Sequence, residues 1–181
     1  MFKISDAVLI YPKTGNDVKN ATVELPLSLL SVAGSLLEAD YSVNLIDARL
    51  DGEWQQKLAK ELESGTHLVC VSSMTGLQIK YALEISKFVR ENTKNGVKVV
   101  WGGAHPTLMP LQTIQHPLID AIVIGEGELP IRNIMDSLEG KKKLHEVNDI
   151  AYREKDGSIK LTPKGELVDP NAIPDLPYDL V

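Results

Sequence analysis

Cysteine is nearly absent from this 181-residue sequence, which contains one, Cys70. One cysteine cannot close an internal disulfide, so we expect a protein of a reducing compartment, that is, a cytoplasmic location. No Cys/His spacing supports a zinc site or an iron–sulfur cluster within these residues. Because Cys70 stands inside the apolar run 68–71, it is predicted to be a small core residue.

Long basic runs and long apolar runs are missing too. The net charge is −6, and the three lysines at 141–143 are too few to follow a phosphate backbone, so nucleic acid is not an expected partner. No apolar run approaches the length of a membrane span, and residues 1–4 lead directly into a predicted strand. We therefore expect neither a membrane span nor a signal peptide.

What the sequence does contain is five rounds of a short apolar strand followed by a helix. Strands are predicted at 7–11, 43–47, 68–72, 97–101 and 121–124, and helices at 26–37, 51–64, 75–92, 110–115 and 128–138. Strands that are apolar on both faces indicate a sheet covered on both sides. The predicted fold class is therefore α/β, with a doubly wound five-stranded parallel sheet in the flavodoxin-like (Rossmann-like) order 2-1-3-4-5.

The pattern changes after Gly140. Residues 150–154 and 158–161 flank Asp156 and Gly157, which predicts a β-hairpin, and four prolines then interrupt a segment without periodicity. We therefore divide the chain into an α/β domain, 1–143, and a hairpin with an extended Pro-rich linker, 144–181. The composition of the linker leads us to expect a further domain after Val181.

Four loops of the predicted fold leave carboxyl ends of strands, where open α/β sheets bind ligands. They comprise residues 12–24, 72–76, 102–107 and 125–128. The pair Gly102 and Gly103 either lets a ligand approach the backbone or forms a turn with positive φ, and the local sequence favours neither. His105 could be a metal ligand, a general base or an ordered loop residue. Glu126 and Glu128 could be an acid–base pair, although Glu128 suits the first turn of a helix.

Common site motifs are absent from these loops. Residues 11–16 do not supply the G-x-G-x-x-G of a dinucleotide site, although Asp47 stands where a ribose-binding acid could. A phosphoacceptor receiver domain would need an Asp in place of Ser72, and a nucleophile elbow is absent. Residues 14–16 only half-match a flavin-phosphate loop.

Several motifs follow one another in a recognisable order. They are LSLL (27–30), LLEA (36–39), YSV (41–43), VSSMT (71–75), WGGAHPT (101–107), IGEGE (124–128), DIAYR (149–153) and IPDLPYD (173–179). This order resembles the N-terminal cobalamin-binding domain of B12-dependent radical SAM proteins, which include methyltransferases and the anaerobic magnesium-protoporphyrin IX monomethyl ester cyclase. The resemblance covers nearly the whole chain.

Two family motifs are missing, and both absences shape what the resemblance implies. Without the Cys-x-x-x-Cys-x-x-Cys motif, S-adenosylmethionine and the iron–sulfur cluster would belong to a radical SAM domain in cis, beyond this chain. Without Asp-x-His-x-x-Gly, the corrinoid would be held base-off, with no protein histidine on cobalt. The chain alone is then not expected to be catalytic, whereas its parent would be a methyltransferase or cyclase.

The resemblance implies cobalamin as the cofactor and a binding site at the carboxyl edge of the sheet. Glycines would admit its nucleotide tail, hydroxyls would bond to it, and Met74, Leu77 and the 12–24 loop would face the corrin ring. The implied cofactor-binding residues are Ser72, Ser73, Met74, Thr75, Gly102, Gly103, His105, Gly125 and Glu126; no catalytic residue and no metal ligand is assigned. Two alternatives stay open: a docking domain of the same family without cofactor, and a flavin- or nucleotide-binding flavodoxin-like protein.

Overall fold

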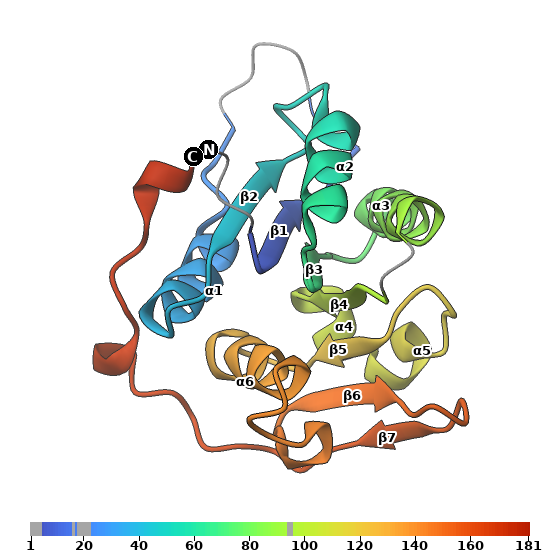
Figure 1. The fold of residues 1–181 in the computed structure, drawn as a ribbon, viewed down its shortest axis with the longest axis vertical. Helices are drawn as coiled ribbons and strands as arrows, with labels where there is room; N and C mark the ends of the chain where they lie inside the picture. The colour runs from blue at the N-terminus through green and yellow to red at the C-terminus, as the bar shows by residue number, and fades with distance from the viewer. Residues whose placement is uncertain (1–4, 16, 18–22, 94–95) are drawn as a thin grey trace.

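A computed structural model describes residues 5–15, 17, 23–93 and 96–181. It contains one mixed sheet in the order β2-β1-β3-β4-β5-β6-β7 (Figure 1). The strands are β1 (Ala7–Tyr11), β2 (Val43–Asp47), β3 (Leu68–Ser72), β4 (Lys98–Gly102), β5 (Ala121–Val123), β6 (Ile150–Arg153) and β7 (Ile159–Leu161). The helices are α1 (Leu27–Glu38), α2 (Trp54–Ser64), α3 (Leu77–Asn92), α4 (Ala104–Leu108), α5 (Pro110–Ile114) and α6 (Glu128–Leu138).

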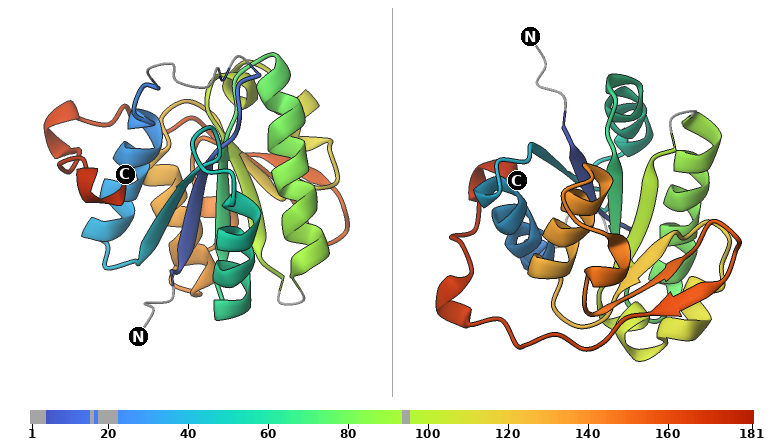
Figure 2. Two further views of the ribbon diagram at one scale, coloured as in Figure 1. Left: turned by 90° about the horizontal axis from the view of Figure 1, so that it is seen from above. Right: turned by 60° about the horizontal axis from the view of Figure 1, so that its bottom comes forward.

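The first five strands are parallel and stand in the predicted order 2-1-3-4-5. Alternate residues of each strand enter opposite layers, so that Leu9 packs under α1 and α6 whereas Ile10 packs under α2 and α3. Figure 2 shows these helix pairs on opposite sides of the sheet. Burial of both faces explains why these strands read as continuous apolar runs.

The prediction of a five-stranded sheet is wrong, because the hairpin extends the sheet to seven strands. Strand β6 pairs antiparallel with β5, with Val123 opposite Ile150, and β7 pairs with β6. Ile150 and Tyr152 enter the layer under α1 and α6, while Ala151 enters the other layer. The strand therefore supplies core residues to both faces, which a free hairpin could not bury.

A second difference lies after β4. The segment 102–107 was predicted to be a loop, but Gly102 ends β4 and residues 104–108 form the short helix α4. Pro106 is compatible with this helix because the first turn does not need its backbone N–H. The helix carries His105 in its first turn, beside the carboxyl ends of the central strands.

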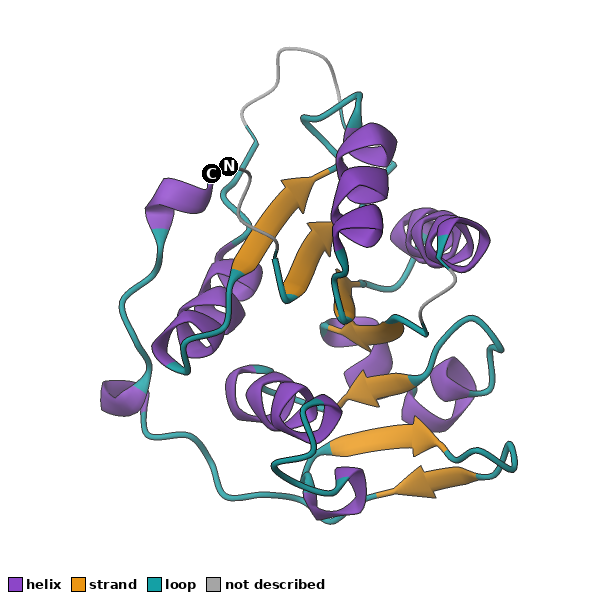
Figure 3. Ribbon diagram, in the orientation of Figure 1, coloured by secondary structure: helices purple, strands orange, loops and turns teal. Residues whose placement is uncertain are grey.

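Residues beyond β7 return along α1 as a mostly irregular segment with two short 3-10 turns, η2 (Pro170–Ala172) and η3 (Tyr178–Leu180) (Figure 3). Leu176 and Leu180 pack against the core layer that contains α1 and α6. The predicted linker is thus folded back on the domain. In the part of the chain that the structure describes, no helix has the length and apolar character needed to cross a membrane.

Candidate functional site

A cavity of about 250 Å³ opens at the carboxyl edge of β3, β4 and β5, between the sheet and helices α1 and α6. Register places Ser72 opposite Gly102 at the ends of β3 and β4. Five of the nine predicted cofactor-binding residues line this cavity: Ser72, Gly102, Gly103, Gly125 and Glu126. The remaining wall is mainly apolar and contains Leu29, Val32, Cys70, Val71, Val123 and Ile131.

The two consecutive glycines between β4 and α4 have different tasks: Gly102 ends the strand and Gly103 precedes the helix. Gly103 has a φ of +98°, and a Cβ built there would lie 2.9 Å from the Ser73 carbonyl oxygen. A Cβ on Gly102 would meet nothing within 4 Å. Gly103 is therefore required by the backbone itself, whereas the missing side chain of Gly102 leaves space beside the cavity.

The two serines after β3 are buried, with Ser72 8% and Ser73 0% exposed. The Ser73 backbone bridges two segments, since its N–H donates to the Gly102 carbonyl (2.8 Å) and its carbonyl accepts from the His105 N–H (3.0 Å). Its hydroxyl oxygen is buried and has no hydrogen-bond partner among the described residues. Such a group is uncommon in folded proteins and is typical of a site that a ligand completes.

Met74, Thr75 and His105 lie outside the cavity wall. Met74 is 46% exposed, and its N–H donates to Gln78 Oε1 at 2.7 Å. Thr75 Oγ1 lies 3.2 Å from His105 Nδ1. These three residues belong to the rim of the carboxyl edge, where a large ring could rest above the cavity.

Thr107 connects the glycine-containing turns that follow β4 and β5 through hydrogen bonds. Its hydroxyl donates to the Gly103 carbonyl (2.9 Å) and accepts from the Gly125 N–H (3.0 Å). Gly125 has a φ of +87°, and a Cβ there would meet nothing within 4 Å. The neighbouring Glu126 is exposed, so the loop forms one side of the cavity mouth.

The sequence reasoning missed the wall that α1 and α6 provide. Glu128 Oε1 accepts a hydrogen bond from Ser31 Oγ at 2.6 Å, and Ser35 Oγ donates to the Glu128 carbonyl at 2.9 Å. The second carboxylate oxygen, Oε2, is buried without a partner among the described residues. Glu128 stands in the first turn of α6, which was one of its two predicted roles, the other being an acid–base pair with Glu126. No motif in the sequence marks the serines of α1 that contact it.

Residues 16 and 18–22 of the 12–24 loop, which was predicted to contact the ring, lie outside the described residues. Its described beginning is anchored, since the Pro12 carbonyl accepts from Gln78 Nε2 at 3.2 Å. Gly15 has a φ of +92° and packs on Leu77, which is itself 59% exposed. Leu77 thus lies at the rim beside Met74.

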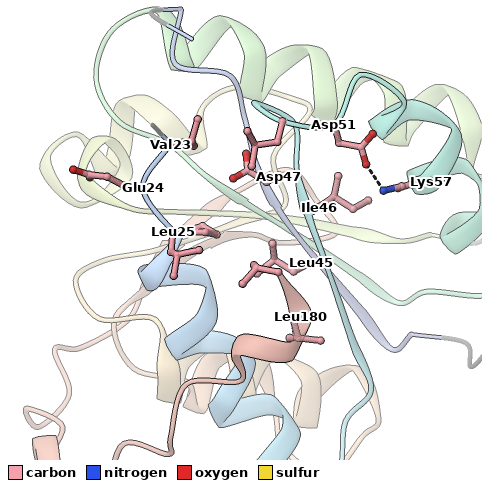
Figure 4. Close-up of a pocket in the computed structure, with 12 residues that line it drawn as sticks. Val23, Glu24, Leu25, Leu45, Ile46, Asp47, Asp51, Lys57 and Leu180 are labelled. Carbon is pink, nitrogen blue, oxygen red and sulfur yellow. Dashed lines mark ion pairs between the residues drawn. The ribbon is translucent and has the colours of Figure 1, made fainter. Parts of the chain in front are cut away.

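A larger cavity of about 490 Å³ lies at the end of β2 and is bordered by Leu180 near the end of the chain (Figure 4). Two of its three acidic side chains are already paired. Asp51 forms an ion pair with Lys57, and Arg49 pairs with Asp47, the residue that could have bound a ribose. Both side chains of the Arg49–Asp47 pair are about 10% exposed, and Arg49 also stacks on Tyr11. The carboxylate on which the ribose-binding alternative depended, that of Asp47, is therefore already paired.

Cys70 forms part of the floor of the 250 Å³ cavity and is 5% exposed. Burial raises the pKa of its thiol well above the usual range, which keeps it protonated and unreactive. Within residues 5–15, 17, 23–93 and 96–181, no group of three His, Cys, Asp or Glu side chains is arranged to hold a metal ion.

Comparison with known proteins identifies the family to which this fold and site correspond. The B12 binding domain family matches residues 18–135. An uncharacterized methyltransferase of Pyrococcus horikoshii is 28% identical over 183 aligned positions, covering 99% of this chain and 39% of the relative. The anaerobic magnesium-protoporphyrin IX monomethyl ester cyclase of Synechocystis is 29% identical over 141 positions, covering 76% of this chain and 28% of the relative. The chain thus spans less than two fifths of either relative.

Two solved structures share the fold. The cobalamin-dependent S-adenosylmethionine radical enzyme OxsB, with aqua-cobalamin and S-adenosylmethionine bound, matches 91% of this chain and 23% of its own length, at a TM-score of 0.73 and 24% identity. The radical S-adenosylmethionine methyltransferase TsrM of Kitasatospora setae, with cobalamin and a [4Fe-4S] cluster bound, matches 96% of this chain and 32% of its own length, at a TM-score of 0.71 and 19% identity.

Proposed function

Because this chain belongs to the B12-binding domain family, we propose that it binds cobalamin at the carboxyl edge of β3, β4 and β5. The nucleotide tail of the corrinoid enters the cavity beside Gly102, and the corrin ring rests on the rim formed by Met74, Thr75 and Leu77. The observation that carries the proposal is the open, largely apolar cavity beneath the Gly102 backbone.

The residues present fit this cofactor. A flat aromatic base requires a narrow apolar cavity, which Leu29, Val32 and Ile131 supply. The polar parts of a nucleotide require hydrogen-bonding groups. Among the residues that line the cavity, Ser28 and Ser72 carry hydroxyls, and Glu128 has a buried carboxylate oxygen without a partner among the described residues. Both kinds of group are therefore available in one place.

Within this proposal, the chain's own residues bind and orient. Gly102 lets the tail lie against the backbone, and the hydrogen bonds of Thr107 keep the turns after β4 and β5 in register. Ser72 and Glu126 line opposite parts of the mouth. When bound, cobalamin supplies methyl-transfer or radical chemistry at its cobalt, and its reactive face would be turned toward a neighbouring domain.

We also propose that this neighbour is a radical SAM barrel in cis, which would hold S-adenosylmethionine and the iron–sulfur cluster. The relatives named as methyltransferase and cyclase are much longer than this chain and support the idea. Three further statements stay predictions of the same proposal. They are the domain boundary between residues 143 and 144, the cytoplasmic location of the protein, and a corrinoid bound base-off with no histidine ligand on cobalt. His105 is assigned to the rim, where Thr75 holds its Nδ1.

Both alternatives fit the geometry less well. A docking domain without cofactor gives no reason for an open cavity whose lining includes Glu128, a residue with a buried carboxylate oxygen that has no partner among the described residues. A flavin- or nucleotide-binding protein would need a phosphate site, and the acid that could have served a ribose, Asp47, is paired with Arg49.

Titration of the chain with hydroxocobalamin, followed by absorbance, tests the proposal. The unmodified chain should bind, and Gly102→Val should weaken binding at least tenfold because its methyl groups occupy the cavity mouth, which corresponds to about 1.4 kcal/mol. The matched control is Gly52→Val, since a Cβ at Gly52 also meets nothing within 4 Å but Gly52 does not line this cavity. Absence of binding by the unmodified chain, or equal binding by both variants, contradicts the proposal; a yellow preparation with flavin absorbance favours the flavin alternative.

A further inference from the structure

Glu128 stands where α1 and α6 meet over the cavity. One carboxylate oxygen, Oε1, accepts a hydrogen bond from Ser31 Oγ at 2.6 Å, and the hydroxyl of Ser35 fixes the Glu128 carbonyl at 2.9 Å. Two serines of α1 therefore hold this residue of α6 in place. Its other oxygen, Oε2, is buried and has no partner among the described residues.

A carboxylate held in this way is prepared for a hydrogen-bond donor. A buried acceptor without a partner costs about 1–3 kcal/mol, and more when it is charged, so a group that supplies the donor gains that much in binding. No donor among the described residues reaches Oε2, and the cavity lining contains no Lys or Arg; its other polar side chains are Ser28, Ser72 and Glu126. The missing donor is then expected to arrive with the ligand.

We propose that Glu128 Oε2 accepts a hydrogen bond from an O–H or N–H group of the corrinoid's nucleotide tail, and that this contact makes the site selective for corrinoids that carry a complete tail. This inference rests on the proposed function. The tail offers ribose hydroxyls, and some tails carry a base with an amino group. Its phosphodiester is an anion and cannot donate, so the two carboxylates at the mouth, Glu126 and Glu128, direct the phosphate away from the cavity.

The decisive comparison uses cobalamin and cobinamide, a corrinoid without the nucleotide. Glu128→Met keeps the length of the side chain but removes both oxygens, so it should weaken cobalamin binding about 10- to 100-fold, as expected for a hydrogen bond to a charged group. Cobinamide binding should change less than about twofold. Glu128→Gln retains an acceptor oxygen and should lose less cobalamin affinity than Glu128→Met.

Ser31→Ala provides a second variant that leaves Glu128 in place. It removes the hydrogen bond that positions Oε1, and it should reduce cobalamin affinity by a smaller factor than Glu128→Met while leaving cobinamide unaffected. The matched control is Glu38→Gln at the last residue of α1, where Glu38 is 56% exposed, pairs with Arg132 of α6 and does not line the cavity. Melting temperatures of the ligand-free variants show whether each is folded.

A further comparison of two corrinoids identifies which group of the nucleotide tail donates to Glu128 Oε2. The dimethylbenzimidazole of cobalamin has no N–H group, whereas a corrinoid whose base is adenine has an amino group. An equal loss for both ligands in Glu128→Met assigns the donor to the ribose, and a larger loss for the adenine corrinoid assigns it to the base. Both results support the inference.

Two results would overturn the inference and leave the proposed function intact. One is unchanged cobalamin affinity in Glu128→Met, and the other is an equal loss of cobalamin and cobinamide affinity, which would mean that the carboxylate acts on the corrin ring. If the unmodified chain binds neither corrinoid, the proposed function itself fails, and the inference fails with it.

Discussion

The hydroxyl of Thr75, on the loop after β3, lies 3.2 Å from Nδ1 of His105 on α4. This contact joins two neighbouring segments at the carboxyl edge, next to the backbone hydrogen bond from the His105 N–H to the Ser73 carbonyl. The imidazole therefore orders the rim, and its Nδ1 already has a partner. This contact gives His105 a structural task at the rim, and the absence of a cobalt–histidine bond stays a prediction.

The first prediction concerns the cobalt spectrum. In the cobalamin-loaded chain, His105→Ala should leave the absorbance spectrum and the electron paramagnetic resonance of reduced Co(II) unchanged, because no histidine nitrogen is expected on cobalt. Affinity should fall less than tenfold, through loosening of the rim. Thr75→Val serves as the matched variant, since it removes the same hydrogen bond and keeps the imidazole. Nitrogen splitting from a protein imidazole that disappears in His105→Ala would disprove this assignment.

The second prediction compares the stability effects of substituting Gly102, the last residue of β4, and Gly103, which follows it. Gly103→Ala should lower the free energy of unfolding by about 1–3 kcal/mol, because its φ of +98° disfavours a Cβ that would also lie 2.9 Å from the Ser73 carbonyl oxygen. Gly102→Ala should leave stability unchanged within about 1 kcal/mol, since it has neither constraint. Urea unfolding of the ligand-free proteins measures both. Equal destabilisation by the two changes would show that the backbone geometry described for Gly103 is not the cause.

The strands were predictable from the sequence, whereas one wall of the site was not. Runs such as Ala7–Tyr11 and Leu68–Ser72 are apolar on both faces, and a parallel sheet covered on both sides produces that pattern. Their carboxyl ends converge in any such sheet, so Ser72, Gly102 and Gly125 could be brought together in advance. Glu128 could not, because its partner Ser31 lies 97 residues earlier and only the packing of α1 on α6 unites them.

The hairpin shows a different limit of prediction. Its turn was evident from Asp156 and Gly157, but a turn signal does not reveal which edge strand the hairpin joins. The position was decided by burial: Ile150 and Ala151 are 0% exposed because each enters a different core layer beside β5. The segment 102–107 shows a similar limit. Pro106 is compatible with a loop and also with the first turn of a helix, and the sequence pattern does not distinguish the two.

The third prediction concerns alkaline pH. Burial, together with a 2.6 Å hydrogen bond to Asp136 and its negative charge, raises the pKa of Tyr41 to about 12. A phenol whose pKa is higher in the folded state than its ordinary value of 10 stabilises the folded state fully below pH 10. That contribution, about 2 kcal/mol, should be lost as the pH rises from 10 through 12.

The measurement for Tyr41 is the difference in the free energy of unfolding between the unmodified chain and Tyr41→Phe. This difference should shrink over that pH interval, whereas the titration of groups that do not contact the Tyr41 hydroxyl affects both proteins alike and cancels. Tyr178→Phe, at a tyrosine that is 55% exposed, should show no such change. A constant difference for Tyr41→Phe would mean that its hydroxyl titrates as it does in the unfolded chain.

The fourth prediction concerns the returning C-terminal segment. A Cβ built on Gly34 of α1 would lie 3.1 Å from the Asp175 carbonyl oxygen and 3.5 Å from Pro174 Cβ, so the segment depends on a glycine there. Gly34→Leu should displace residues 174–180 and free Leu176 and Leu180 from the core layer under α1, while the helix itself gains about 0.8 kcal/mol of propensity. Limited proteolysis should then cut within residues 163–181 faster, without loss of the sheet's circular-dichroism signal.

Glu38→Leu tests whether that effect depends on position. It adds the same side chain to the same helix one turn further on, at a residue whose side chain is 56% exposed and pairs with Arg132 of α6, and it should leave the cleavage rate unchanged. Leu180 borders the cavity at the end of β2. Displacement of the segment therefore also moves Leu180 away from that cavity. If Gly34→Leu and Glu38→Leu were cut at equal rates, the segment would not owe its position to the close approach at Gly34.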